Sequence, residues 1–259
     1  MAEILPEDPA AERVEFMEDL ESEQSLEPLK IESSRLGVAN KKKIHVVCHA
    51  CNSGWMSRLE PPSKTVLVPL MTGGEIALDG AAITQLAKFI MLKIMVAEHD
   101  AFPGRNTMPI YTAEDRRRFK DAPYIPDGVR IWIGPGGGPK WRTSIYRYVS
   151  GVRLTTAPPG SVIEPGFERR GANIQSVTWG IGRFFVHVVA TTNLEFYSAH
   201  GWEVPPGLTP IWPLDGSTIA WPPNFAFTDW MVDQMAESLK ALSKTMHKVR
   251  SDGMLLPPG

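Results

Sequence analysis

The chain has 259 residues, of which 43% are hydrophobic, and it includes 8 tryptophans and 10 phenylalanines. This length and apolar content suffice for a buried core, which excludes the disordered and fibrous classes. Apolar runs stay shorter than the roughly eighteen residues of a membrane span, and the acidic N-terminus lacks the basic and apolar regions of a secretory signal. We therefore expect a soluble, cytoplasmic protein without membrane contact.

The net charge of −2 is unevenly distributed. Residues 1–40 carry eleven acidic and three basic side chains, whereas the remainder has a net charge of about +6. Within this acidic arm, residues 8–25 have the spacing of a helix but only a thin apolar stripe, so we favour a solvated arm over a docked helix or a surface that mimics DNA. The basic body is compatible with nucleic-acid binding, although such domains usually show a denser basic patch.

Residues 41–62 have the pattern of a small finger. Three lysines, Lys41, Lys42 and Lys43, precede a β-branched run at 44–47 that predicts a strand. A Cys-x2-Cys turn and a short helix follow, and we expect this helix to stop at Pro61 and Pro62, because proline lacks the backbone donor that a helix needs.

Residues 63–259 are predicted to form one α+β body. The expected elements are a strand at 66–70, a turn at Gly73 and Gly74, a core helix at 81–98 capped by Asp79, a basic helix at 113–120, antiparallel strands between 129 and 192, and a long C-terminal helix at 228–249. The fold class is therefore α+β: a partial zinc-knuckle unit, a central helix, an antiparallel sheet and a long C-terminal helix. The Met/Leu seam of the last helix could pack on the sheet or pair two chains.

Cys48 and Cys51 are the only cysteines. Two thiolates on one tight turn suit two corners of a tetrahedral zinc, and a structural site needs two further ligands. His45 could contribute, or the thiols of a second copy in a dimer, whereas His49 lies inside the turn and is sterically disfavoured. Two alternatives are an empty knuckle held by packing of Trp55 and a redox-active dithiol, for which the expected βαβ context is missing.

The string Cys48-x2-Cys51-Asn52, with Trp55-Met56 and Leu59-Glu60 following, resembles the C-terminal half of an HNH endonuclease of the ββα-metal type. In that family two Cys pairs bind a structural zinc, and an acidic-His pair on the first strand supplies a metal ligand and the general base. The resemblance covers most of residues 41–259. It implies that Cys48 and Cys51 are the second zinc pair and that Asn52 helps to hold a catalytic divalent ion such as Mg²⁺.

The first half of this motif is missing, because residues 1–44 contain no cysteine and no histidine. Hydrolysis of a phosphodiester needs a base as well as a metal, so we expect a protein that is weakly active or inactive alone. The pair Glu98-His99 follows the knuckle and ends a helix, so we interpret it as a helix terminus. The candidate phosphate contacts are two basic runs, Lys41–Lys43 and Arg116–Arg118. Short charge runs are usually solvated surface.

Two functions follow from these patterns. The first is an HNH-endonuclease-like, nucleic-acid-associated protein of the bacterial or phage type, with an incomplete catalytic finger. The second is a non-enzymatic interaction module that binds a protein partner or a second copy of itself.

Overall fold

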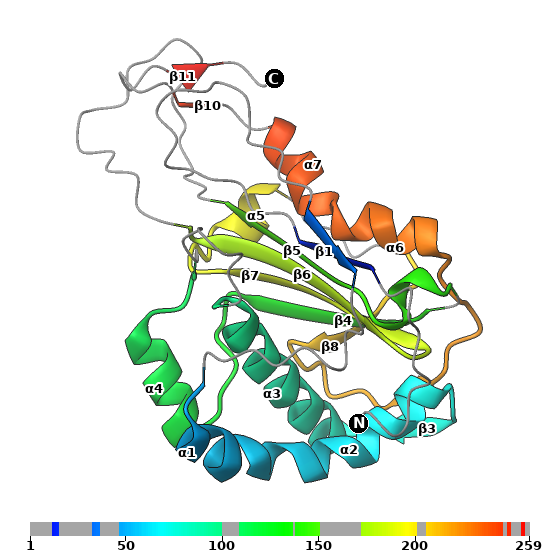
Figure 1. The fold of residues 1–259 in the computed structure, drawn as a ribbon. Helices are drawn as coiled ribbons and strands as arrows, with labels where there is room; N and C mark the ends of the chain where they lie inside the picture. Colours follow the sequence, from blue (N-terminus) through cyan, green and yellow to red (C-terminus); the bar gives the residue numbers. More distant parts are fainter. Residues whose placement is uncertain are drawn as a thin grey trace.

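The computed structural model describes residues 47–99, 109–136, 138–150, 172–200 and 206–245, together with the short strands at 12–15, 33–36, 248–249 and 255–256. The fold is α+β, as predicted, with a central antiparallel sheet between helices (Figure 1). The elements in chain order are β1 (Glu12–Glu15), β2 (Ser33–Leu36), α1 (His49–Cys51), η2 (Asn52–Met56), α2 (Ser57–Thr72), β3 (Ile76–Leu78), α3 (Gly80–Ala97), α4 (Ala113–Asp121), β4 (Val129–Pro135), η3 (Lys140–Arg142), β5 (Ile145–Ser150), β6 (Ile174–Ile181), β7 (Phe184–Thr191), α5 (Phe196–His200), β8 (Thr209–Trp212), β9 (Ile219–Trp221), α6 (Asp229–Ala236), α7 (Ser238–Thr245), β10 (Lys248–Val249) and β11 (Leu255–Leu256).

The main sheet has five strands in the order β5-β6-β7-β4-β8, and all its pairs are antiparallel. Every residue of β7 is buried. Alternate side chains of a strand point to opposite faces, and here Val186 and Val188 join one hydrophobic cluster while Phe185 and Val189 join the other. Both faces of the sheet therefore need a helical cover. The edge strand β8 contains Pro210, which pairs with Trp132 of β4.

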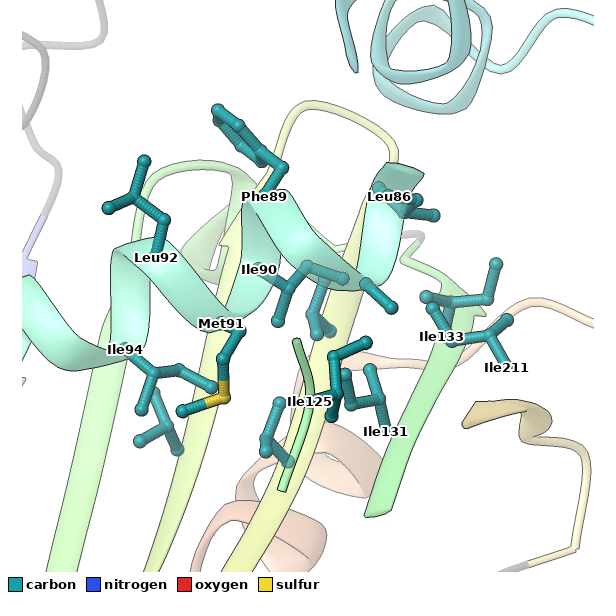
Figure 2. Packing of buried hydrophobic residues seen from close by; sticks show 14 of the residues in the cluster. Leu86, Phe89, Ile90, Met91, Leu92, Ile94, Ile125, Ile131, Ile133 and Ile211 are labelled. Carbon is teal, nitrogen blue, oxygen red and sulfur yellow. The ribbon is translucent and has the colours of Figure 1, made fainter. Parts of the chain in front are cut away.

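Helix α3 covers one face, and it confirms the predicted core helix and its cap. The Asp79 carboxylate accepts a hydrogen bond from the Ala82 N–H at 2.8 Å. Ile90 and Met91 project from α3 toward Ile125 and Ile131 (Figure 2). By length and composition this 18-residue helix could cross a bilayer, and 56% of it is buried inside the protein.

Helices α6 and α7 cover the other face (Figure 1). The prediction of one long helix from 228 to 249 is wrong, because a turn at Glu237 separates α6 from α7 and β10 occupies Lys248–Val249. Met235 and Leu239 of the predicted seam are buried in the cluster that contains Trp132. The described part of the seam therefore packs on the sheet of its own chain.

The knuckle helix continues where two prolines were expected to stop it. Pro61, Pro62 and Pro69 all lie inside α2, and the strand predicted at 66–70 is helical instead. The buried residues Val66, Leu67, Leu70 and Met71 share one helical face, so burial of this face outweighs the unfavourable local propensity. The turn at Gly73 is confirmed: this glycine ends α2 with a φ of 76°, in the left-handed region that glycine tolerates.

The helical spacing of residues 8–25 does not produce a helix at the four residues of this segment that the structure describes. Glu12–Glu15 forms β1, which pairs antiparallel with β2. The rest of the acidic arm lies outside the described residues, and so do Lys41, Lys42, Lys43 and His45 of the predicted finger.

Candidate knuckle and basic-helix site

The two cysteines lie at the start of the helical run that leads into α2. Cys48 has extended backbone angles (φ −66°, ψ 153°) and its Sγ accepts a hydrogen bond from the Cys51 N–H at 3.3 Å. Both thiols are free; Cys48 is exposed and Cys51 is half-buried. Hydrogen bonds from the Cys51 N–H lower the pKa of the Cys48 thiol, which favours the thiolate that binds metals.

Two thiols are half of the four donors that a structural zinc site needs. In the part of the chain that the structure describes, no group of three or more His, Cys, Asp or Glu side chains is placed to hold a metal ion. The exposed His49 lies 3.5 Å, through Nδ1, from the Ser53 hydroxyl one turn further on. Zinc binding by Cys48 and Cys51 therefore stays a prediction that needs donors from His45 or another chain.

Asn52 is exposed and directly follows Cys51. Its backbone N–H donates to the Cys48 carbonyl at 3.0 Å. The helix is kinked two residues later at Gly54, whose angles (φ −94°, ψ −110°) are not helical. Asn52 thus lies at an irregular, exposed part of the helical run.

His187 and His99 belong to the sheet and to the end of α3, and neither is part of the knuckle that carries Asn52. His187 is fully buried in β7, and burial lowers its pKa to about 3. His99 follows the C-terminus of α3, as predicted, but burial and the nearby Arg116 and Arg147 lower its pKa. The proton acceptor that hydrolysis needs is therefore not supplied by these two side chains at the knuckle.

The fold brings the knuckle helix next to the basic helix α4. Trp55 contacts Phe119 edge to face, with ring centroids 6.1 Å apart. Figure 1 shows α1 beside α4, although the two helices are far apart in the sequence. Two separately predicted elements, the knuckle and the arginine run, therefore belong to one side of the molecule.

The three arginines of α4 differ in their surroundings. Arg117 and Arg118 have side chains 71% and 67% exposed, and both are paired with Glu114, at 3.1 and 3.4 Å. Arg116 instead turns inward: its Nη1 donates to the Tyr111 carbonyl at 2.5 Å and lies 3.9 Å from Glu98 Oε2. Arg117 and Arg118 are thus the more accessible of the three side chains.

Glu98 forms a buried network that the sequence patterns did not reveal. Its Oε1 accepts hydrogen bonds from the Ile110 N–H at 3.1 Å and the Gln175 Nε2 at 2.7 Å. Arg147 Nε donates to Gln175 Oε1 at 2.8 Å, which extends the network to β5. Burial raises the pKa of Glu98 to about 7, against the opposing effect of Arg147. The Glu98-His99 pair was visible, but no local pattern identifies its partners.

The site therefore belongs to an α+β protein with an antiparallel sheet between two helical layers. No protein-family model matches the chain, and neither does any curated protein or solved structure. The resemblance to HNH endonucleases accordingly rests on the motif between Cys48 and Glu60.

Proposed function

We propose that this chain is an HNH-endonuclease-like, nucleic-acid-associated protein whose catalytic finger is incomplete, so that it binds nucleic acid and is weakly active or inactive alone. The observation that supports this most is the juxtaposition of the knuckle with α4 through Trp55 and Phe119. A metal-binding turn beside an exposed basic helix is a suitable arrangement for contacting a phosphate backbone.

The charges of this surface define how binding would behave. Arg117 and Arg118 are exposed on α4, and Arg58 is exposed on α2, one turn after the kink at Gly54. Arginine side chains that contact phosphates displace condensed counterions, so affinity falls as salt is added. The competing Glu114, which pairs with both α4 arginines, would have to release them on binding.

Zinc would have a structural role at this surface. Cys48 and Cys51 would supply two thiolates, and His45 or a second copy of the chain would supply the remaining donors. If a divalent ion such as Mg²⁺ also binds, Asn52 is the residue that the resemblance assigns to it. Without a positioned base, that ion would not be enough for efficient hydrolysis.

Nucleic-acid binding is tested by fluorescence anisotropy with labelled DNA and RNA oligonucleotides at 50 and 200 mM salt. We expect salt-sensitive binding, and we expect Arg117→Gln/Arg118→Gln to weaken it and to reduce the salt slope by about 1 for each arginine that no longer neutralises a phosphate. The control is Arg142→Gln/Arg183→Gln. These two arginines are exposed at the opposite end of α2, where the Arg183 N–H donates to the Met71 carbonyl.

Equal weakening of nucleic-acid binding by both double variants, or no binding at 50 mM salt, would count against the proposal.

Zinc binding is tested by measuring the zinc content per chain together with the molar mass in solution. If wild type contains zinc and the Cys48→Ser and Cys51→Ser variants do not, the two cysteines bind it. Half an equivalent of zinc per chain in a dimer supports a site shared between two chains. Magnesium-dependent nicking of plasmid DNA that survives Asn52→Ala would reject the role assigned to Asn52.

A second candidate function is a non-enzymatic interaction module. It is favoured by Trp230 of α6, which is 69% exposed and has the largest exposed fraction among the large hydrophobic side chains described. Large exposed aromatic side chains are frequent anchors of protein interfaces. A chain that does not bind nucleic acid at low salt, and whose concentration-dependent molar mass is reduced by Trp230→Ala, would support this function instead.

A further inference from the structure

A pocket of about 390 Å³ lies between the start of α4, the loop before β4 and the end of β7. Its lining includes Tyr111, Asp115, Tyr124, Asp127 and Leu194. None of these residues belongs to the knuckle or to the α4 arginines, so the pocket is a separate feature from the nucleic-acid surface proposed above. Its volume is in the range of small-molecule sites.

Exposed apolar side chains gather at this pocket. Tyr124 is 36% exposed and Leu194 is 58% exposed, and both line it. Scattered exposed hydrophobic residues are ordinary, but two that converge on one concave site are what a planar apolar ligand would contact.

Tyr111, one of the lining residues, carries a polar group without a hydrogen-bond partner among the described residues. This residue is only 4% exposed, and the group is its hydroxyl. Burial, and to a smaller extent the charge of Glu98, raise the pKa of Tyr111 well above its usual value, so the hydroxyl stays protonated. A neutral phenol can both donate and accept a hydrogen bond, and a ligand would provide the missing partner.

The charge of the lining is negative. Asp127 is exposed, and its carboxylate makes no hydrogen bond or ion pair with the described residues. Asp115 also lines the pocket, but its carboxylate is occupied by the backbone N–H and hydroxyl of Thr112. Lysine and arginine are absent from the described lining, and the nearby Arg130 donates to the Asp127 carbonyl and stacks over Tyr197. An anionic ligand is therefore disfavoured.

We propose that this pocket binds a small planar aromatic cation with N–H donors. The ring would lie against Tyr124 and Leu194, and the N–H groups would donate to the Asp127 carboxylate and the Tyr111 hydroxyl oxygen. The attraction of a cation to an aromatic ring, here that of Tyr124, adds to this preference. The proposal is independent of nucleic-acid binding.

The test compares three probes of the same shape: benzamidine, a cation; benzamide, which is neutral; and benzoate, an anion. Binding is followed by titration with two-dimensional ¹H–¹⁵N NMR on the full chain. We expect benzamidine to bind most tightly and benzoate least. Tyr111→Phe should weaken benzamidine binding several-fold and Asp127→Asn about tenfold, the losses expected for a neutral and a charge-assisted hydrogen bond.

Phe225→Ala is the matched control, because Phe225 is 42% exposed and does not line the pocket. It should leave the affinity for benzamidine unchanged, and circular dichroism should show that all three variants are folded. Benzoate binding as tight as that of benzamidine would overturn the proposal. The absence of benzamidine binding at about 10 mM, a concentration that reveals even weak sites, would also overturn it. The same holds if neither Tyr111→Phe nor Asp127→Asn changes the affinity for benzamidine.

Discussion

The indole ring of Trp55 and the phenyl ring of Phe119 lie edge to face, with their planes at 68°. Phe119 is 1% exposed and belongs to the core cluster that also contains Met56, so the helix after the cysteines is anchored in the body of the protein. Here the knuckle shares the core of the sheet and α3.

Phe119→Ala should therefore destabilise the protein by about 3–5 kcal/mol, the cost of removing a buried phenyl ring and leaving a cavity. Urea unfolding followed by circular dichroism measures the loss. Phe225→Ala is the control. Because Phe225 is 42% exposed, its removal should lower the free energy of unfolding much less. If the two variants have equal free energies of unfolding, the anchoring role of Phe119 is wrong.

Glu98→Gln should make the protein more stable above pH 7. Burial raises the pKa of Glu98 from 4.5 to about 7, so between these values the folded state holds a proton that the unfolded state has released. Stability therefore falls as the pH rises through this window, by up to about 3 kcal/mol. The groups facing Glu98 are Arg147, Arg116 and Tyr111, and the two arginines only partly offset the burial.

Urea midpoints of wild type and Glu98→Gln at pH 4.5 and pH 8 test this expectation. Glutamine resembles the neutral form of the acid, so Glu98→Gln should be more stable than wild type only at pH 8. The exposed Glu114→Gln is the control and should show no such gain. A Glu98→Gln protein that is less stable than wild type at pH 8 would show that the arginine charges dominate.

His187 should make the protein sensitive to acid. Burial lowers its pKa from 6.5 to about 3, so below pH 6.5 the unfolded state binds a proton that the folded state does not. Stability due to this residue is therefore complete above pH 6.5 and is lost progressively as the pH falls toward 3. Its Nδ1 is 2.8 Å from the Thr178 hydroxyl, and its ring stacks on Trp132.

The double variant His187→Phe/Thr178→Val keeps a ring against Trp132 and replaces both polar partners with apolar groups, which can be nearly neutral. Its free energy of unfolding should decrease less between pH 6.5 and pH 4 than that of wild type. Thr178→Val alone retains the histidine and should remain as acid-sensitive as wild type. Identical pH profiles for the double variant and wild type would refute the role of His187.

Asp233→Ala should loosen α6 from the segment before β5. Asp233 Oδ1 accepts hydrogen bonds from Trp141 Nε1 at 3.0 Å and Lys140 Nζ at 2.7 Å. Because Trp141 is 4% exposed, the variant leaves a buried N–H unpaired, at a cost of about 1–3 kcal/mol. Thermal unfolding measures it, with the exposed Asp121→Ala as the control that should change little. Equal melting temperatures for the two variants would contradict the prediction.

The sequence predicted elements well where one periodicity was strong. The core helix at 81–98 has a wide apolar stripe and a capping aspartate, and α3 matches it. The prediction failed at Pro61 and Pro62, because burial of Val66, Leu67, Leu70 and Met71 outweighs the local preference of proline against a helix. Their spacing is helical, and their burial becomes apparent only with α3 in place.

The candidate site was predictable only as a motif. Cys48, Cys51 and Asn52 could be recognised because they are close in the sequence. The contact of Trp55 with Phe119 and the bond of Glu98 to Gln175 join segments far apart in the chain, and no local pattern encodes such pairings. The inward turn of Arg116 likewise depends on where the carboxylate of Glu98 lies in the fold.

Strand β8 has a consequence for solubility. An exposed strand at the margin of a sheet can be extended by a strand from another molecule, which is a common route to aggregation. Pro210 lacks an amide hydrogen, so an incoming chain cannot complete a regular ladder along β8. Concentrated samples should therefore resist β-type polymerisation at this margin.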